Sequence, residues 1–279
     1  MKWIDLHNHT TASDGTFSPE QAVAYAAKKG LAAMAVTDHD TAAGAAEALG
    51  YAGRYGVEVI PGIEISADYR GLGGVHLLGY FIDPHSPHLA PVLDWIIADR
   101  TARNERIAAL MRADGLDVSL EAMEEKHPGT VIGRPHFAQE LVERGLCESV
   151  TEGFRRYLDR GKPYYQPRHF LPLDQAFRAI REAGGKAVFA HPLQYRLGNE
   201  NLTALTARLT EAGCVGMECL YSGYTPEQSA YLMNLAARFG LCVTGGSDFH
   251  GSGKPQIDMG SGTGDLRVPY ELLEKLREA

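Results

Sequence analysis

One unit recurs along this chain: an alanine-rich helical stretch ends at a glycine, and a short apolar run follows. Glycine is favoured just past a helix because that position requires a positive φ. Two Ser/Thr-Pro-Glu-Gln segments, at 18–21 and 225–228, mark helix starts with a capping residue and proline in the first turn. Repeated helix–glycine–strand units predict parallel strands joined by helices. The glycines that end these helices are Gly30, Gly56, Gly184, Gly213 and Gly240.

Seven short apolar segments are predicted to be strands, and seven such units favour a closed or nearly closed barrel. The fold class is therefore α/β, a distorted (β/α)7-type barrel, with a doubly wound open sheet as the alternative. The order of the strands is not readable from the sequence. The predicted strands are Ile4–His9, Met34–Asp38, Val59–Glu64, Val75–Tyr80, Ala187–His191, Val215–Cys219 and Val243–Asp248.

The repeat of helix–glycine–strand units is interrupted between residues 89 and 167, where apolar residues fall at helical spacing and no strand pattern occurs. We interpret residues 89–167 as a helical insertion, and residues 1–88 and 168–279 as the barrel domain. The insertion is expected to contribute substrate contacts. Three arginines of its first predicted helix are interpreted as a solvent-exposed face: Arg100, Arg103 and Arg106.

The composition limits the class of partner. The formal net charge is −8 over 279 residues, which argues against stable binding of duplex nucleic acid. A small nucleotide or a short oligonucleotide in a locally positive cleft remains compatible, and the sequence names no protein partner. No apolar stretch has the length of a membrane span, and the four cysteines form no close pair. We expect a cytoplasmic protein with reduced cysteines and no membrane contact.

Histidines and carboxylates cluster at the ends of the predicted strands. His7 and His9 are two apart on one strand, so both imidazoles share a face and can reach one metal. Asp248 and His250 have the same spacing at the end of the last strand. In a parallel barrel these ends meet at one mouth, where so many ionisable groups require cations. A metal cluster is predicted from these and from Asp14, Asp38, His39, Glu64, His76 and His191.

Five ordered motifs resemble those of the polymerase-and-histidinol-phosphatase (PHP) family, in particular its stand-alone bacterial members that act on nucleotide phosphates. The resemblance implies three divalent metal ions, with manganese favoured and zinc or iron as alternatives. It also implies hydrolysis of a phosphate monoester by a hydroxide that bridges two of the metals. The motifs are Asp5-Leu6-His7-Asn8-His9, Thr37-Asp38-His39, Gly62-Ile63-Glu64, Ala190-His191-Pro192 and Ser247-Asp248-Phe249-His250.

The resemblance assigns nine ligands. One ion is expected on His7, His9, Glu64 and Asp248, a second on Glu64, His76 and His191, and a third on Asp14, His39 and His250. Asp14 stands where some relatives have histidine, and its harder oxygen ligand favours manganese or iron over zinc. Asp5 and Asp40 are candidates to orient imidazoles, with capping or ion pairing as the alternative. Asp248 would orient the attacking water, and the proton donor to the leaving oxygen would be His191, His250 or a water on the third metal.

Substrate phosphate needs donors beyond the metals. Arg134 and His136, in Gly133-Arg134-Pro135-His136, are predicted substrate contacts because a guanidinium grips phosphate oxygens with two donors. Lys162 and Arg168 are weaker candidates for a second phosphate or a base. Either tyrosine of the pair at 164–165 is a candidate to stack on a base.

The sequence is compatible with four functions. The first is removal of the 3′-phosphate from a nucleoside 3′,5′-bisphosphate, with short 5′-phosphorylated oligonucleotides as further substrates. The second is a histidinol-phosphate phosphatase, which shares the metal chemistry but needs no second phosphate site. The third is a metal-dependent amidohydrolase, which commonly has a carboxylated lysine on the fourth strand, where this chain has none. The fourth is a non-catalytic metal-binding module.

Overall fold

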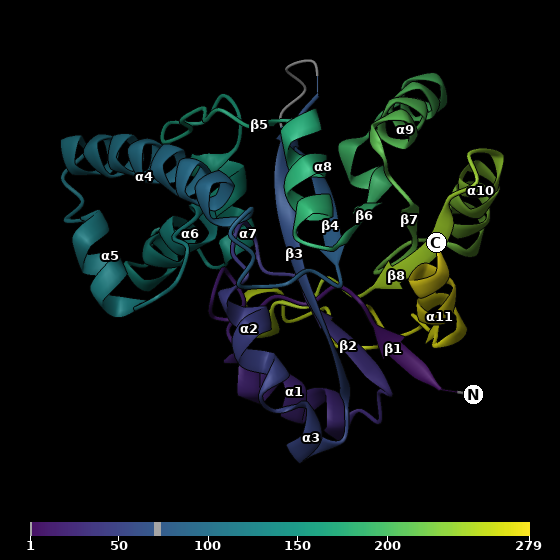
Figure 1. The fold of residues 1–279 in the computed structure, drawn as a ribbon. Helices are drawn as coiled ribbons and strands as arrows, with labels where there is room; N and C mark the ends of the chain where they lie inside the picture. The colour runs from purple at the N-terminus through teal and green to yellow at the C-terminus, as the bar shows by residue number, and fades with distance from the viewer. Residues whose placement is uncertain (1, 70–73) are drawn as a thin grey trace.

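The structure is a computed structural model, described over residues 2–69 and 74–279, and it contains all seven predicted strands (Figure 1). Two further short strands, β5 and β9, add to them. The strands are β1 Trp3–Asp5, β2 Ala33–Val36, β3 Glu58–Asp68, β4 Gly74–Tyr80, β5 Leu171–Pro172, β6 Lys186–Phe189, β7 Gly216–Tyr221, β8 Cys242–Gly246 and β9 Val268–Pro269.

Helices cover the outside of this sheet. The predicted helix starts are confirmed: Ser18 and Thr225 cap α1 and α10, and each forms a capping box with the glutamine three residues later. The helices that flank the strands are α1 Pro19–Lys28, α2 Ala43–Leu49, α3 Ala52–Tyr55, α8 Leu173–Glu182, α9 Asn199–Ala212, α10 Pro226–Arg238 and α11 Glu271–Glu278, with short 3₁₀ turns η2 Pro192–Tyr195 and η3 Gly251–Gly253.

The strand order is β8-β7-β6-β4-β3-β2-β1-β9, with β5 paired to β3. The expectation of parallel strands throughout is wrong at β4, which runs antiparallel to both β3 and β6. The reason is that β3 extends for 11 residues, and the chain then returns along it, pairing Ser66 with His76, without a crossover helix. Because β4 is reversed, the beginning of this strand, and with it His76, lies where the parallel strands end.

The sheet closes on itself between β1 and β8. The Leu6 amide donates to the Gly245 carbonyl (3.2 Å), and the Asp248 amide donates to the His7 carbonyl (2.9 Å). Gly246 makes this approach possible, because a Cβ there would lie 2.4 Å from the His7 Cβ. The result is a nearly closed mixed barrel, as the predicted distorted barrel requires.

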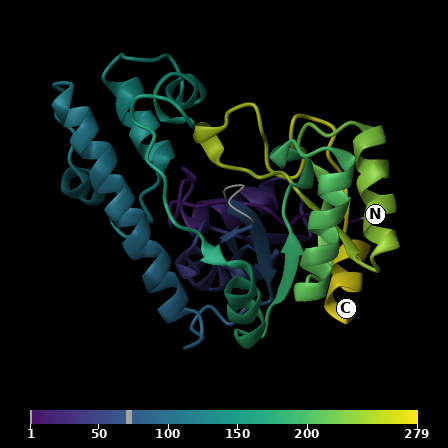
Figure 2. The same ribbon diagram turned by 90° about the horizontal axis from the view of Figure 1, so that it is seen from above.

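A separate group of helices, α4–α6 among them, stands beside the barrel on the side opposite α9–α11 (Figures 1 and 2). Its members are α4 Ala90–Ala113, α5 Leu120–Lys126, α6 Arg134–Glu143, α7 Val150–Gly153 and the π-helical turn η1 Phe154–Leu158. These helices share an apolar cluster of their own, which includes Ile107, Met111, Phe137 and Leu141. A separate cluster of this kind is what we expect of the proposed insertion. Within the described residues, no helix is both long and apolar enough to cross a membrane.

Candidate metal centre

The nine predicted ligands come together at the mouth of the barrel. Their side chains form four overlapping groups in which the nitrogen and oxygen atoms lie within 4.8 Å of one another. Glu64, at 0% exposure, lies at the centre, since its two oxygens approach five imidazoles at 2.8–3.4 Å. The groups are His7–His9–Asp248, His7–Glu64–His191, His39–Glu64–His76 and His9–Asp14–His39–His250.

These atoms fit metal ligands because so many of them are buried without a partner. Within the described residues, both ring nitrogens of His9, Nε2 of His7, Nδ1 of His39, Nδ1 of His191 and Oε2 of Glu64 form no hydrogen bond. The nitrogens of His7, His9 and His39 lie 3.0–3.4 Å from Glu64 Oε2, but the angles are not those of hydrogen bonds. Buried polar atoms left unpaired are costly. Divalent cations would satisfy them, so the residues present fit a metal centre.

The protonation states also suit cation binding. Burial acts to raise the pKa of Glu64, but the surrounding imidazoles outweigh it and hold the pKa well below its usual range. The same balance keeps the pKa of Asp14 low. The pKa of Asp248 is also low despite burial, chiefly because of the neighbouring Lys254 ammonium and then because of His250 and His7. Burial lowers the pKa of His39 to about 3. The centre therefore presents carboxylates in their ionised form and the His39 imidazole in its neutral form, and both forms bind metals.

A buried carboxylate on β7 orients two of the predicted ligands. Glu218 Oε1 lies 3.0 Å from His7 Nδ1, and Oε2 accepts the backbone amide of His191 (2.7 Å). The first bond turns the other ring nitrogen of His7, Nε2, towards Glu64 and Asp248. An outer carboxylate of this kind fixes the tautomer and the angle of a ligating imidazole. Sequence reasoning missed Glu218, although an acidic residue inside the apolar run 215–219 was a signal.

Two other carboxylates hold the loops that carry the ligands. Asp38 accepts the Thr10 amide (2.7 Å) and the hydroxyls of Thr10 and Ser13, which fixes the loop between His9 and Asp14. Asp5 accepts the amide and the hydroxyl of Ser247 and the amides of His7 and Gly260. Asp5 therefore has the capping role, since it accepts backbone amides and does not orient an imidazole ring. The reason is that β1 and β8 bring Ser247 onto its carboxylate.

Asp248 has a fixed orientation and an unpredicted cation beside it. Its Oδ2 accepts hydrogen bonds from the Tyr221 hydroxyl (2.7 Å) and from Lys254 Nζ (2.8 Å), while Oδ1 lies 3.2 Å from His9 Nε2. Lys254 also lines the cavity above the centre. Asp248 (φ 59°) and His191 (φ 31°) both adopt the left-handed backbone region, which is unfavourable outside glycine. Strained backbone of this kind is typical of functional sites.

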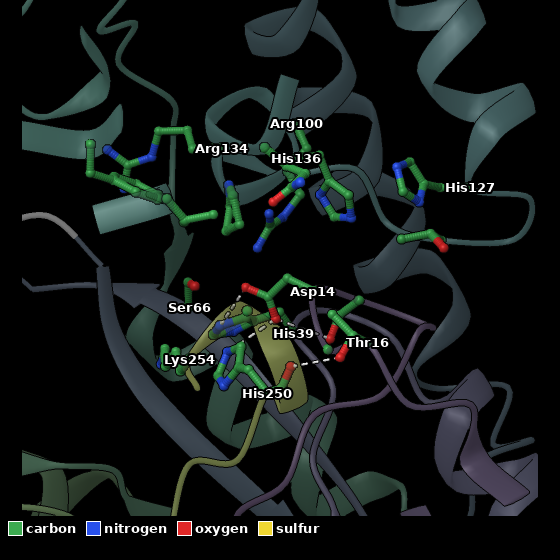
Figure 3. Close-up of a pocket in the computed structure, with 18 of the residues that line it drawn as sticks. Asp14, Thr16, His39, Ser66, Arg100, His127, Arg134, His136, His250 and Lys254 are labelled. Atoms are coloured by element: carbon green, nitrogen blue, oxygen red, sulfur yellow. Dashed lines mark hydrogen bonds and ion pairs between the residues drawn. The ribbon is translucent and has the colours of Figure 1, made fainter. Parts of the chain in front are cut away.

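Opposite the metal centre, the helices carry positive charge. The two faces enclose a cavity of about 760 Å³, and Figure 3 shows Arg100, Arg134 and His136 across it from His39 and His250. We call the arginines on this side the arginine roof: Arg100, Arg103, Arg134 and Arg168. The interpretation of Arg100 and Arg103 as solvent-exposed is wrong, because the face of α4 that bears them packs over the cavity. Arg106 is exposed as predicted.

Only part of the charge on the arginine roof is neutralised. Arg100 and Arg168 both bind the buried Asp40, which therefore pairs with guanidiniums and does not orient an imidazole. Arg103 is 4% exposed and donates from Nε to Asn104 Oδ1 (2.9 Å). Among residues 2–69 and 74–279, no carboxylate forms an ion pair with Arg103 or Arg134. The roof thus retains unpaired positive charge that an anionic substrate can neutralise.

The pKa of Arg103 also reflects this excess of positive charge. Burial, reinforced by its three arginine neighbours, lowers the pKa of this guanidinium to about 8. Guanidinium groups stay protonated in proteins. The unfavourable burial of this charge is therefore relieved when an anion enters the cavity.

The other predicted substrate residues divide into two sets. His136 lines the cavity, and its Nδ1 accepts the Gly133 amide (3.0 Å), so the neutral ring carries its proton on Nε2. Tyr165 also lines the cavity. Lys162, by contrast, is exposed in a turn and does not line the cavity. Tyr164 is buried, stacks on Tyr157 and donates to Asp114, so it cannot stack on a base.

Fold and site together define a phosphoesterase in which a metal centre faces a cationic roof. The chain belongs to the PHP family: the PHP domain model matches residues 5–197. It is 36% identical over 261 residues to the 3′,5′-nucleoside bisphosphate phosphatase of Chromobacterium violaceum, covering 93% of this chain and 91% of that protein. It is also 36% identical over 258 residues to the 5′-3′ exoribonuclease Rnm of Escherichia coli, covering 92% and 87%.

Solved structures agree with the fold. A protein from Bifidobacterium adolescentis superposes with a TM-score of 0.86 at 32% identity, covering 99% of this chain and 95% of that one. A Chromobacterium violaceum protein described as an amidohydrolase, with bound sulfate and no metal, gives 0.85 at 35% identity, covering 92% and 89%. The chain is therefore a PHP-family metal-dependent phosphoesterase.

Proposed function

We propose that this phosphoesterase removes the 3′-phosphate from nucleoside 3′,5′-bisphosphates and cuts the same P–O3′ bond in short 5′-phosphorylated oligonucleotides. One observation carries the proposal: a metal centre and a roof with unpaired guanidiniums face each other across one cavity. A substrate with two phosphates satisfies both faces at once. The names of the two relatives, a bisphosphate phosphatase and an exoribonuclease, support the same substrate class.

Three divalent ions, manganese first and zinc or iron as alternatives, would be held by the nine ligands in the sets given by the family resemblance. When bound, they would supply Lewis acidity and lower the pKa of water. Asp248 is held by Tyr221 and Lys254, so its carboxylate has a fixed position from which to orient the attacking water. His191 and His250 remain the proposed proton donors to the leaving oxygen.

The residues of the roof bind and orient the substrate. Arg103 and Arg134 offer guanidinium donors to the distal 5′-phosphate, and His136 offers its Nε2 proton to a phosphate or ribose oxygen. Arg168 lines the same cavity but shares Asp40 with Arg100, so its contribution to phosphate binding is partly offset. Lys162 is not part of the proposed substrate site because it lies outside the cavity.

The other functions account for less of the site. Histidinol phosphate has a single phosphate and would leave the unpaired arginines without an anion. An amidohydrolase of the expected kind requires a lysine on β4, and the strand reads Gly-Val-His-Leu-Leu-Gly-Tyr. A non-catalytic module gives no reason for a cavity of this size above the metal centre.

The test compares phosphate release by the manganese-loaded protein from adenosine 3′,5′-bisphosphate, adenosine 3′-monophosphate, adenosine 5′-monophosphate and histidinol phosphate. The bisphosphate should have the highest kcat/KM. Replacing Arg103 by Met should lower kcat/KM for the bisphosphate about 10- to 100-fold and change that for the 3′-monophosphate little. Arg134→Ala should act in the same direction.

Arg106→Met is the matched control, because Arg106 lies one turn further along α4 and is exposed. Equal rates on the bisphosphate and the 5′-monophosphate would contradict the proposal. A preference for histidinol phosphate, unchanged in Arg103→Met and Arg134→Ala, would establish the second function instead.

A further inference from the structure

A groove runs along the outer face of α1 and meets the active-site cavity at its rim. We call it the α1 groove; it has a volume of about 490 Å³. Thr16 and Ser252 line both the groove and the cavity. The two residues are joined, since the Ser252 amide donates to Thr16 Oγ1 (2.9 Å). Each lies two positions after a predicted metal ligand, Asp14 and His250 respectively. The groove therefore begins beside the metal centre.

The walls of the α1 groove have the character of a single-stranded nucleic-acid site. Gln21, Tyr25 and Lys28 line it at three- and four-residue spacing, so they form one stripe along α1. Phe17, which directly precedes the helix cap Ser18, lines the same groove. The Phe17 ring is partly exposed and braced edge-on by Tyr25 (5.3 Å between ring centroids) and Phe249 (5.2 Å). Aromatic rings that stack with bases, together with a cation that meets the backbone, are the usual elements of such sites.

Lys28 supplies that cation. It is exposed at the end of α1, and within the described part of the chain no carboxylate forms an ion pair with it, whereas the neighbouring Lys29 binds Asp258 (2.7 Å). From Gln21 to Lys28 the helix rises about 10 Å. A strand that leaves the metal centre at Thr16 and passes Phe17 would thus bring a later phosphate towards Lys28.

We propose that the α1 groove holds the nucleotides downstream of the scissile phosphate when the substrate is an oligonucleotide. This inference rests on the proposed function. The oxygen of water attacks phosphorus, the P–O3′ bond breaks, and the 3′ oxygen of the first nucleotide takes up a proton. The phosphate stays on the 5′ oxygen of the remaining strand, which therefore needs room beside the metal centre. A nucleoside bisphosphate has no such strand and does not reach the groove.

The experiment measures kcat/KM for adenosine 3′,5′-bisphosphate and for a 5′-phosphorylated adenosine trinucleotide, with manganese-loaded protein. Phe17→Leu keeps apolar volume but removes the stacking plane, and should lower the trinucleotide value about 5- to 100-fold. Lys28→Ala should lower it less, and should reduce the slope of its logarithm against log salt by about one. Both variants should keep the bisphosphate value within about twofold.

Lys29→Ala is the control for charge on the same helix end, and it should leave both substrates unchanged. The inference is overturned if the groove variants affect both substrates equally or neither of them. Wild-type protein that cleaves the bisphosphate but not the trinucleotide also overturns it, and leaves the proposed phosphatase intact. Cleavage of the trinucleotide alone, sensitive to Phe17 and Lys28, supports the groove and rejects the phosphatase. Inactivity on both substrates rejects both.

Discussion

The two sides of the active-site cavity bury groups that call for ligands of opposite charge. On the barrel side, imidazoles and carboxylates are fixed by strand ends and by partners such as Glu218, and several of their inner atoms lack hydrogen bonds within the described part of the chain. On the helical side, guanidiniums surround a single buried carboxylate, Asp40. The first arrangement fits cations and the second fits an anion. In the proposed function, the barrel side therefore carries the chemistry and the helical side carries the recognition, and the two sides meet only in the folded protein.

The largest effect should come from the centre of the barrel side. Glu64→Gln removes the charge that five imidazoles surround, and should lower kcat on the order of 10³-fold or more. Elemental analysis should show fewer bound ions per chain. Glu47→Gln, on an exposed face of α2, is the control and should retain metal and activity. Full activity of Glu64→Gln after metal loading would mean that the barrel side is not the reaction centre.

The next largest effect should be on stability, and it should come from Asp40, whose ion pairs with Arg100 and Arg168 join the two sides. Asp40→Asn leaves the buried guanidiniums of Arg100 and Arg168 without a counter-charge, and should destabilise the fold by about 3–5 kcal/mol. Denaturant unfolding measures this change. The matched control is Asp174→Asn, which breaks an exposed pair with Arg208 and should cost about 1 kcal/mol or less. Similar losses in both variants would show that Asp40 does not join the two sides.

A substitution of Glu218 tests whether this residue orients the metal ligands, because it leaves the ligands themselves in place. The Glu218 carboxylate accepts hydrogen bonds from both the His7 ring and the His191 amide. In Glu218→Gln, the side-chain NH2 group replaces one of the two acceptors and must face one of these donors. Metal affinity should fall about 10- to 100-fold while the ligands remain present. Titration with manganese should therefore restore kcat at a higher metal concentration. If saturating metal does not restore activity, Glu218 has a role beyond positioning.

What the sequence revealed about each side differs for a physical reason. The strands follow a local pattern, namely glycine after helices, so they were predictable. The nine ligands were implied by the family resemblance, whose motifs place histidines and carboxylates at the strand ends, and the fold brings these side chains together. The direction of β4, the burial of Arg103 and the contacts of Lys254 depend on how distant segments pack. An arginine on a helix has the same local pattern whether its face meets solvent or a cavity. Glu218 lies between these cases, because its acidic side chain interrupts an apolar strand.

The smallest effect should come from Lys162, a predicted substrate residue that lies outside the cavity. Its side chain is exposed beyond η1, while its backbone amide donates to the Asp159 carbonyl in a turn. Lys162→Ala should change kcat/KM for the bisphosphate less than about twofold, because exposed charges far from a ligand are screened by salt. Steady-state kinetics at low and at physiological salt would check this. A loss comparable to that of Arg103→Met would mean that the roof extends to this turn when substrate binds.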